Sequence, residues 1–111
     1  MASAPQGPST RKVLVSWYGH AWCGRLTAAG AHKSMAVPPW AWRFDCQRLT
    51  CAHRTLPFGT ILMVKRGDVR LPVMVTDRGP EDPARELDLS AAAAGALGLI
   101  SAGIGYVEIG P

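Results

Sequence analysis

The stretch 49–80, LTCAHRTLPFGTILMVKRGDVRLPVMVTDRGP, constrains the fold more than any other part of the chain. Residues 61–65 and 70–76 are rich in apolar and β-branched side chains with rough period-2 alternation, which predicts two strands with one face in a core. Gly67-Asp68 between them is typical of a tight turn, because glycine adopts a positive φ at low cost. The stretch therefore predicts a β-hairpin.

A histidine and an aspartate flank this hairpin. Pro57 and Gly59 interrupt regular structure before the first strand, so His53 is predicted on an extended segment that enters a turn. Asp77 lies where the second strand ends, in the tetrapeptide Asp-Arg-Gly-Pro. Loop residues at strand ends, held by a rigid sheet, often carry catalysis or binding. The hairpin is thus predicted to present one acid and one base.

Motifs spread over most of the chain resemble the signature of the rare lipoprotein A domain family. The motifs are Ser16–Gly19 (SWYG), Gly24–Ala28 (GRLTA), Phe44-Asp45, Leu49-Thr50, Ala52–Thr60 (AHRTLPFGT), Asp77–Pro80 (DRGP) and Asp88–Ser90 (DLS). The resemblance implies a mainly β fold, a six-stranded double-psi β-barrel related to expansins and barwin, here with one short helix. It also implies that the relatives are septal lytic transglycosylases or peptidoglycan-binding modules.

The rest of the chain predicts further elements of the same barrel. Residues 13–18 predict its first strand and residues 104–109 its last. Ser90 is a predicted N-cap for a short helix over 91–97, because its hydroxyl can accept from a free backbone N–H and alanine favours helix. Gly98 is predicted to end that helix.

The chain is predicted to form one domain with a tail and an inserted loop. Residues 1–12 are polar and contain Pro, Gly and Ser, which predicts a flexible N-terminal tail without a signal peptide. Residues 13–111 are assigned to the barrel. Residues 31–42 have no regular period and contain two adjacent prolines, so they predict a surface loop inserted relative to the family.

Charge and hydropathy narrow the classes of partner. The net charge of +4 and pI near 9.3 favour a polyanionic partner, such as cell wall with its carboxylates. The Lys and Arg residues are scattered and form no basic face, so nucleic acid is not predicted. The apolar stretch near 91–104 is too short and too rich in glycine for a membrane span. Peptidoglycan glycan strands are the predicted partner, without a cofactor.

The three cysteines leave the disulfide pairing open. Cys23, Cys46 and Cys51 allow one disulfide, which would pin the loop after Gly30 to the barrel, or buried free thiols. No C-x-x-C pair is present and no histidine is placed as the partner of a zinc module, so no metal site is predicted.

The resemblance assigns the chemistry to Asp77 and His53. Asp77 matches the family aspartate and is predicted to be the general acid, whereas the alternative is a side chain that only caps a turn. His53 matches a second family position and is predicted to act with Asp77 by positioning substrate or sharing its proton. The alternative for His53 is a structural hydrogen bond to backbone at the turn.

Further residues are predicted to bind substrate. Tyr18 belongs to an aromatic set on which sugar rings could stack. Arg54 and Arg78 are expected to pair with substrate carboxylates or with the catalytic aspartate. Trp40 and Trp42 lie in the Pro-rich loop 31–42 and are predicted to be exposed, either to the glycan or to a protein partner that docks there.

One position departs from the family pattern. The family usually has a Gly-Glu pair shortly before Phe44-Asp45, and that glutamate resembles a third functional residue. Here Trp42 stands two positions before Phe44. Glu81 and Glu86 lie on another loop, from which either could fold toward the cleft. The sequence alone therefore leaves catalytic activity open.

Three functions remain on the sequence evidence. The favoured one is cleavage of glycan strands by lytic transglycosylation, with 1,6-anhydro-muramic products, in the cell envelope, periplasm or outside the cell. The second is a peptidoglycan-binding module without catalysis. The third is a phage virion or tail component that uses the barrel as a structural and docking scaffold, which the predicted lack of a signal peptide favours.

Overall fold

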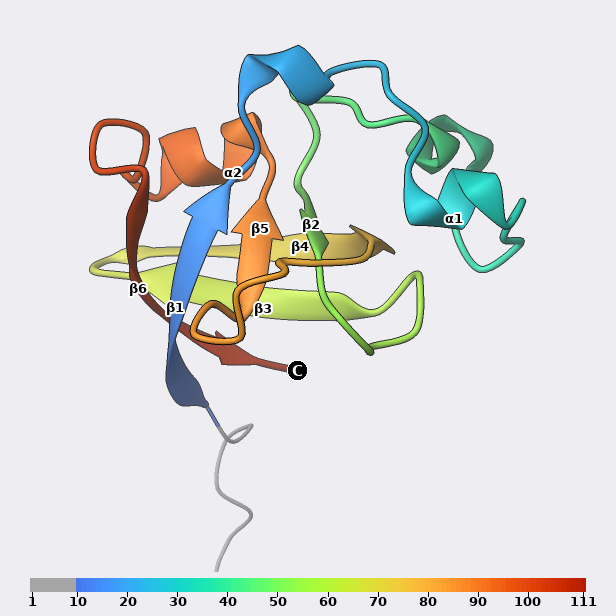
Figure 1. The fold of residues 1–111 in the computed structure, drawn as a ribbon. Helices are drawn as coiled ribbons and strands as arrows, with labels where there is room; N and C mark the ends of the chain where they lie inside the picture. Colours follow the sequence, from blue (N-terminus) through green and yellow to red (C-terminus); the bar gives the residue numbers. More distant parts are fainter. Residues whose placement is uncertain (1–9) are drawn as a thin grey trace, which may run out of the picture.

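The computed structural model describes residues 10–111 and is built mainly from short strands (Figure 1). The strands are β1 (Arg11–Trp17), β2 (Thr50–Ala52), β3 (Ile61–Arg66), β4 (Val69–Asp77), β5 (Leu87–Leu89) and β6 (Ile104–Gly110). The helices are α1 (Ala28–Ala31) and α2 (Ala91–Ala96), with 3-10 turns η1 (His20–Trp22) and η2 (Pro39–Trp42). Of the predicted tail, residues 1–9 lie outside the described part, and β1 already includes Arg11 and Lys12.

The strands close into a barrel in the order β1-β5-β2-β4-β3-β6. β1 runs parallel to β5 and β2 parallel to β4, and the other neighbours are antiparallel. The predicted hairpin is β3–β4, and its two strands are three residues longer in total than the alternation indicated. The closed six-stranded barrel confirms the predicted mainly β fold class.

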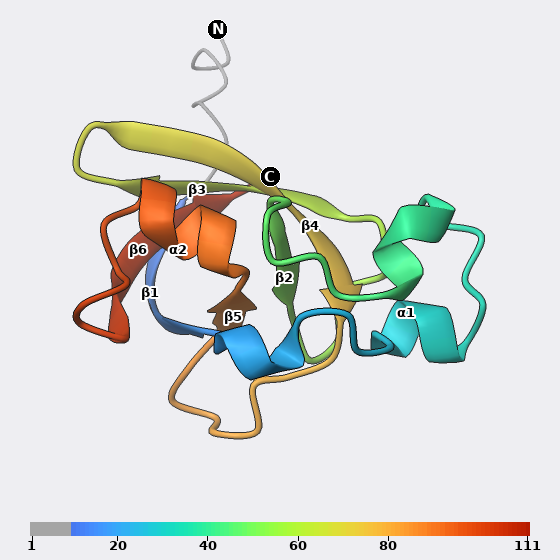
Figure 2. The ribbon, with the colours of Figure 1, turned by 90° about the horizontal axis from the view of Figure 1, so that it is seen from above.

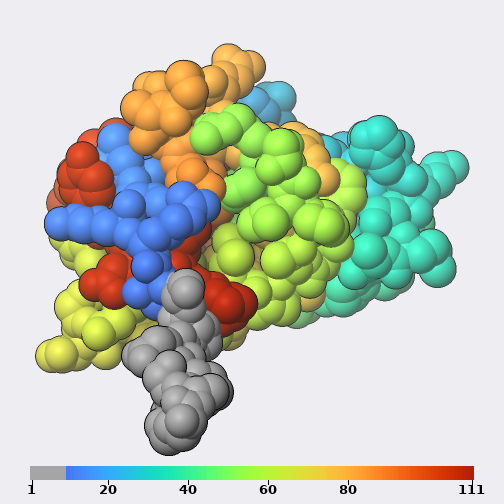
Figure 3. All heavy atoms as spheres, turned by 90° about the horizontal axis from the view of Figure 1, so that it is seen from below, coloured from blue at the N-terminus to red at the C-terminus, as the bar shows by residue number. Residues whose placement is uncertain are grey.

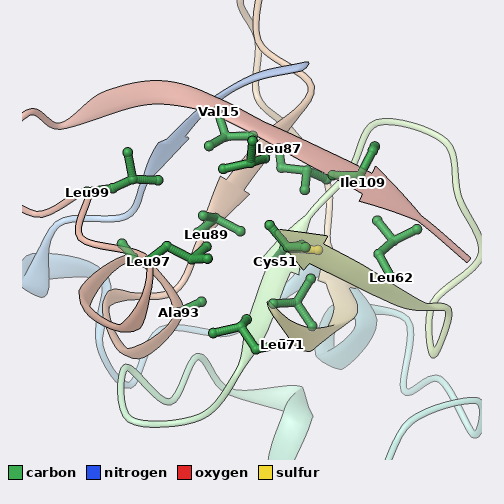
Figure 4. Close-up of a cluster of buried hydrophobic side chains, with 14 of the residues drawn as sticks. Val15, Cys51, Leu62, Leu71, Leu87, Leu89, Ala93, Leu97, Leu99 and Ile109 are labelled. Carbon is green, nitrogen blue, oxygen red and sulfur yellow. The ribbon is translucent and has the colours of Figure 1, made fainter. Parts of the chain in front are cut away.

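Alternation along the strands fills the barrel with apolar side chains (Figure 4). The fully buried members of this core include Val15, Cys51, Val64, Val73, Val75, Leu87, Leu89 and Leu99. Leu87 and Leu89 point into the core, so Asp88 between them faces outward. The same alternation faces Ser16 outward, because it follows Val15 on β1.

The helix after β5 forms as the sequence predicts. The Ser90 hydroxyl accepts a hydrogen bond from Ala93 N–H at 3.2 Å, and Leu97 and Gly98 follow the last helical turn. Sequence analysis predicted one short helix and missed α1, whose four residues are too few to show a helical period. Within residues 10–111, no helix is long and apolar enough to cross a membrane.

Residues 27–42 form a small lobe, called the α1–η2 lobe below, which projects from the barrel on the side away from α2 (Figures 1 and 2). In the space-filling view of Figure 3 it is the cyan end of the molecule. Ala29, Val37 and Ala41 form a small core of its own. The predicted surface loop 31–42 therefore contains the end of α1 and all of η2.

The close approach of α1 to η2 requires a glycine. A Cβ atom on Gly30 would lie 2.0 Å from the carbonyl oxygen of Trp42. Thr27 joins α1 to η2 by hydrogen bonds. Its hydroxyl donates to Ala41 O at 2.8 Å and accepts from Gly30 N–H at 3.0 Å. The two segments can therefore pack at this distance only while position 30 lacks a side chain.

A disulfide joins the segment after η1 to the segment after the lobe. Among the cysteines, Cys23 and Cys46 are bonded, with Cα atoms 5.5 Å apart, and Cys51 is a free, buried thiol in the barrel core. The bridge encloses residues 24–45, so it ties the two ends of the α1–η2 lobe together. Of the pairings that the sequence left open, the structure forms this one.

We predict that Gly30→Ala destabilises the protein by about 1–3 kcal/mol, because the new methyl group must push backbone aside. Helix propensity alone predicts the opposite sign, since alanine stabilises a helix by up to about 1 kcal/mol relative to glycine. Urea unfolding of both proteins measures the difference. Gly19→Ala is the matched control, because a Cβ there has no atom within 4 Å, and a stable Gly30→Ala variant would contradict the packing argument.

Candidate active site

Four residues form a row across four neighbouring strands of the barrel. Asp77 on β4 pairs with Ala52 on β2, Ala52 pairs with Asp88 on β5, and Asp88 pairs with Ser16 on β1. Paired residues on neighbouring strands point to the same face of a sheet. The row therefore presents two carboxylates and a hydroxyl on the outside of the barrel, with a small alanine between the carboxylates.

Asp77 reaches this face because of an irregularity in β4. Leu71, Val73 and Val75 point into the core, and simple alternation would send Asp77 inward as well. The pairing of β2 with β4 shifts register between Cys51 and Ala52, so that Ala52 lies opposite Asp77 and skips Thr76. An extra residue of this kind reverses the face on which the following side chains lie.

Ser16, Asp77 and Asp88 of this row line the floor of an open groove of about 540 Å³, whereas Ala52 is fully buried. η1 and the loop between β4 and β5, at the lower edge of Figure 2, contribute its walls. The lining residues that matter below are Ser16, Tyr18, Trp22, Asp77, Arg85 and Asp88. A groove with aromatic side chains and two acids has the composition of a site for a polar ligand with apolar faces.

The Asp77 carboxylate is held firmly at one oxygen. Its Oδ1 accepts from the backbone N–H groups of Ala28, at 2.8 Å, and Arg78, at 2.9 Å. Its Oδ2 accepts from the Tyr18 hydroxyl at 3.1 Å. The first bond ties the start of α1 to the end of β4, so the α1–η2 lobe helps to orient the acid.

The Tyr18 hydroxyl stays protonated beside this carboxylate. Burial, followed by the negative charges of Asp77 and Asp88, raises the pKa of Tyr18 far above its ordinary value of 10.0. Its ring packs edge-on against Phe44, with centroids 4.7 Å apart. The phenol therefore keeps its proton at any working pH and remains fixed beside Oδ2. Tyr18 lines the groove, and its predicted contact with substrate stays a prediction.

The His53 ring does not reach the Asp77 carboxylate. Its Nδ1 accepts from the backbone N–H groups of Thr55, at 3.1 Å, and Leu56, at 3.0 Å, so the proton belongs on Nε2. Nε2 lies 2.9 Å from Glu86 Oε2. Only the backbone joins the two predicted residues, through His53 N–H and Asp77 O at 3.1 Å. The side chain, 8% exposed as a residue, is a connector of loops in this structure.

Glu86 is a residue of this network that sequence analysis did not assign. Its Oε2 accepts from Arg11 at 2.6 Å as well as from His53. The Arg11 hydrogen bond, and then that of His53, lower the pKa of Glu86 to about 2 against the opposing effect of burial. The carboxylate therefore stays charged and fixes the His53 tautomer. Glu86 does not line the Asp77 groove.

Both arginines predicted to bind substrate donate to backbone. Arg54 Nη1 donates to the carbonyls of Pro80 and Arg85, at 3.1 and 2.7 Å, and so holds the loop between β4 and β5. Arg78 Nη1 donates to His53 O and Leu56 O, and its guanidinium lies 4.0 Å from the centre of the Phe58 ring. Of the two, only Arg78 lines the groove.

The prediction that Trp40 and Trp42 are exposed on a loop is wrong. Both are partly buried against the small core of the α1–η2 lobe, Trp42 Nε1 donates to Ser34 O at 2.9 Å, and neither lines the Asp77 groove. The exposed tryptophan at the groove is Trp22 on η1, which is 51% exposed. Arg25 lies 4.9 Å from the centre of its ring. Proline-rich composition suggested exposure but could not show that the loop had its own core.

Asp88 and Ser16 are also groove residues that sequence analysis left without a role. Ser16 donates a short hydrogen bond to Asp88 Oδ1, and Arg85 Nη1 donates to Ser16 Oγ at 2.7 Å. The position of Asp88 between two leucines was a readable signal, because alternation places it outside the core.

One group of metal-ligand types lies close together. Within residues 10–111, His20, Cys23 and Cys46 place possible ligand atoms within 4.8 Å of one another. The two sulfurs are bonded to each other, so neither is a thiolate, which is the form that binds metal. Neither the row of four residues nor the disulfide fits a metal site.

Comparisons with known proteins agree with this architecture. A family described as lytic transglycolase, with a double-psi β-barrel, matches residues 42–109. Two relatives are named probable endolytic peptidoglycan transglycosylase RlpA. The protein of Synechocystis is 43% identical over 86% of this chain, and the protein of Aquifex aeolicus is 44% identical over 87% of this chain. The chain spans 27% and 39% of those relatives.

Two solved structures share the fold at low sequence identity. Streptomyces papain inhibitor matches with a TM-score of 0.64 and 17% identity, over 92% of this chain and 93% of the inhibitor. A mutant expansin of Clavibacter michiganensis in complex with cellohexaose matches with a TM-score of 0.65 and 20% identity, over 91% of this chain and 49% of the expansin.

We predict that Glu86→Gln removes a stabilisation that depends on pH. The folded-state pKa of about 2 lies below the unfolded value of 4.5, so the Glu86 charge stabilises the fold above pH 4.5, and this contribution disappears as the pH falls toward 2. The difference in urea midpoint between wild type and Glu86→Gln should therefore shrink over that window. Glu108→Gln, an exposed change on β6, is the control, and a constant difference for Glu86→Gln would contradict the network.

Proposed function

The chain belongs to the RlpA family of double-psi β-barrels, and from this we propose that it cleaves peptidoglycan glycan strands by lytic transglycosylation, with Asp77 as the general acid. One observation carries the proposal. The Asp77 carboxylate lies in an open groove, with one oxygen fixed by two backbone N–H groups and the other beside the Tyr18 hydroxyl.

The proposed reaction breaks the bond between C1 of a muramic acid and the oxygen of the next sugar. Asp77 donates a proton to that oxygen, which leaves as a free hydroxyl, and positive charge develops at C1. The C6 hydroxyl of the same muramic acid attacks C1 and passes its proton to a carboxylate of the groove, which gives the 1,6-anhydro product. Because no water is consumed, the site needs no water-binding pocket behind the sugar.

The hydrogen bonds of Asp77 suit a proton donor with a defined direction. The two N–H groups can only donate, so a proton on the carboxyl group belongs on Oδ2, on the side of Tyr18. The Tyr18 hydroxyl can donate to the anion and accept from the acid, since a phenol does both. The pair can therefore hold Asp77 in one orientation before and after proton transfer.

His53 is proposed to act as a positioning residue in this reaction. Its backbone N–H bonds to Asp77 O, its carbonyl accepts from Arg78, and its ring joins the turn at Thr55 to Glu86. These contacts connect three loops at the groove. A histidine so engaged has no free ring nitrogen with which to exchange protons with the acid.

Trp22 is proposed to provide the sugar-binding wall. Its ring is exposed at the groove and lies 6.2 Å from that of Tyr18, so the two aromatics can cover the apolar face of a sugar. The net charge of +4 suits a polymer that carries carboxylates. The proposed place of action is wherever peptidoglycan is exposed, in the envelope or outside the cell.

The relatives and the structural neighbours bear on the alternatives. The named relatives are described as peptidoglycan transglycosylases, which supports catalysis. The expansin neighbour is a complex with cellohexaose, which keeps glycan binding without cleavage as the second candidate. The phage-tail alternative gains no support from these comparisons. The partial burial of Trp40 and Trp42 in the lobe disfavours a protein that docks on these rings.

We predict that Asp77→Asn abolishes release of anhydro-ended fragments from purified sacculi, measured by mass spectrometry, while binding to sacculi persists. Asparagine keeps the shape and the acceptor for the two N–H groups but carries no acidic proton. Asp68→Asn, in the exposed β3–β4 turn, is the matched control and should behave as wild type. Full activity of Asp77→Asn would sink the proposed role, and a wild type that only binds would favour the second candidate.

We predict that Trp22→Ala weakens binding to sacculi. An aromatic contact of about 0.5–1.5 kcal/mol corresponds to a loss of roughly 2- to 12-fold in affinity. Pelleting of the protein with sacculi measures the loss. Tyr106→Ala removes another exposed aromatic, 58% exposed on β6, and should bind as wild type. Equal binding by all three proteins would place the sugar elsewhere.

A further inference from the structure

Asp88 is a second acid of the groove that the reaction proposed above does not use. It lies at the centre of β5, between the core residues Leu87 and Leu89, so its backbone position is fixed by the barrel. It pairs with Ser16 on one side and with Ala52 on the other. Packing does not require a charged side chain at such a position, because strand alternation determines only that the side chain points outward.

The contacts of Asp88 hold one oxygen and leave the other open. Ser16 donates to Oδ1, and Arg85 Nη1 donates to the same serine oxygen at 2.7 Å. Within residues 10–111, no hydrogen bond to Oδ2 is formed. Oδ2 lies 3.6 Å from the place of a Cβ atom on Gly79, whose φ of +135° disfavours any side chain. Asp88 lines the groove, and a glycine at position 79 brings no side chain against this oxygen.

The spacing of the row sets the distance between the two acids. Asp77 and Asp88 are separated by one strand, β2, so their Cα atoms are about 9–10 Å apart at the usual strand spacing. In inverting glycosidases, whose base activates a water, the acid and base carboxyl groups are about 6.5–9.5 Å apart, so two separated carboxylates can act on one sugar. The residue between them is Ala52, which is fully buried and carries no polar group, so no other side chain of β2 competes for the ligand between the two acids.

We propose that Asp88 is a second catalytic residue, the base that accepts the proton of the attacking C6 hydroxyl. This inference rests on the proposed lytic transglycosylation. Asp77 gives its proton to the leaving oxygen as the C1–O bond breaks, the C6 oxygen forms its bond to C1, and the C6 proton passes to Asp88 Oδ2. One proton enters the product and one leaves the substrate, so the step is balanced without a co-reactant.

Charge and geometry favour Asp88 over its alternatives for this role. Asp77 Oδ1 is occupied by two N–H groups, so after proton transfer only Oδ2 could serve as the base. Trp42 occupies the position at which the family resemblance implies a glutamate, and it is packed in the α1–η2 lobe. Glu86 is bound to Arg11 and His53 outside the groove. Among the described residues, Asp88 has an oxygen without a protein partner and lines the same groove as Asp77. Glu81 also lines the groove, but it is exposed on the loop between β4 and β5, whereas strand pairing on both sides fixes the backbone of Asp88.

The test compares the rates at which Asp88→Asn, Asp88→Ala and wild type release anhydro-ended fragments from sacculi. General base catalysis contributes about 10²–10⁴-fold, so both variants should be at least about 100-fold slower. Sodium formate, a small carboxylate, should restore part of the rate of Asp88→Ala and none of that of Asp77→Asn. Binding to sacculi should stay within about twofold, since the wall residues are unchanged. Asp68→Asn is again the control.

Each result decides the proposal. Asparagine can still accept from Ser16, so Asp88→Asn should fold, and thermal unfolding checks this. If Asp88→Asn does not fold, the rates of two other variants are compared. Asp88→Glu keeps a carboxylate and should be faster than the folded Asp88→Ala. A near wild-type rate for Asp88→Asn, or no response of Asp88→Ala to formate, overturns the role of Asp88 while leaving that of Asp77. A wild type without anhydro products overturns the proposed function and this inference together.

Discussion

The extra residue in β4 is the feature on which the groove depends. Without the register shift opposite Ala52, Asp77 would follow Val73 and Val75 into the core, where an unpaired charge is costly. With the shift, Thr76 takes the buried place and Asp77 faces outward beside β2. Because β2 pairs with β4 on one side and β5 on the other, the same strand then places Asp88 on that face.

Polar contacts around this row serve mostly to fix loops. Arg54 and Arg78 direct their donors to backbone carbonyls, and His53 joins two N–H groups to Glu86. Buried carbonyl and N–H groups need such partners, because water cannot reach them. Charged side chains beside a site can therefore fix its loops without touching a ligand, which is what the contacts of the arginines and His53 do in this structure. The loops of the barrel then behave as one rigid frame around Asp77.

Local sequence patterns predicted the elements that depend on local physics. The β3–β4 hairpin followed from alternation, and the Ser90 cap from its hydroxyl. The placement of site residues depended on contacts between distant segments. Alternation could not reveal the shifted register at Thr76, and composition could not reveal that Trp42 packs in a small core. Asp88 was predictable in principle, since two leucines flank it, but its neighbour Ser16 is 72 residues away.

The barrel strands and the α1–η2 lobe differ in how they hold the residues of the groove. Residues 27–42 rest on the barrel through Ala28 and Asp77 and are closed by the Cys23–Cys46 disulfide, so their interior can vary while the strands stay in register. A tryptophan in place of a glutamate there serves the packing of the lobe. Asp88 is fixed by the strands themselves, so it remains on the groove floor whatever the lobe contains. An acid held by strand pairing is therefore the more durable partner for Asp77 in the proposed reaction.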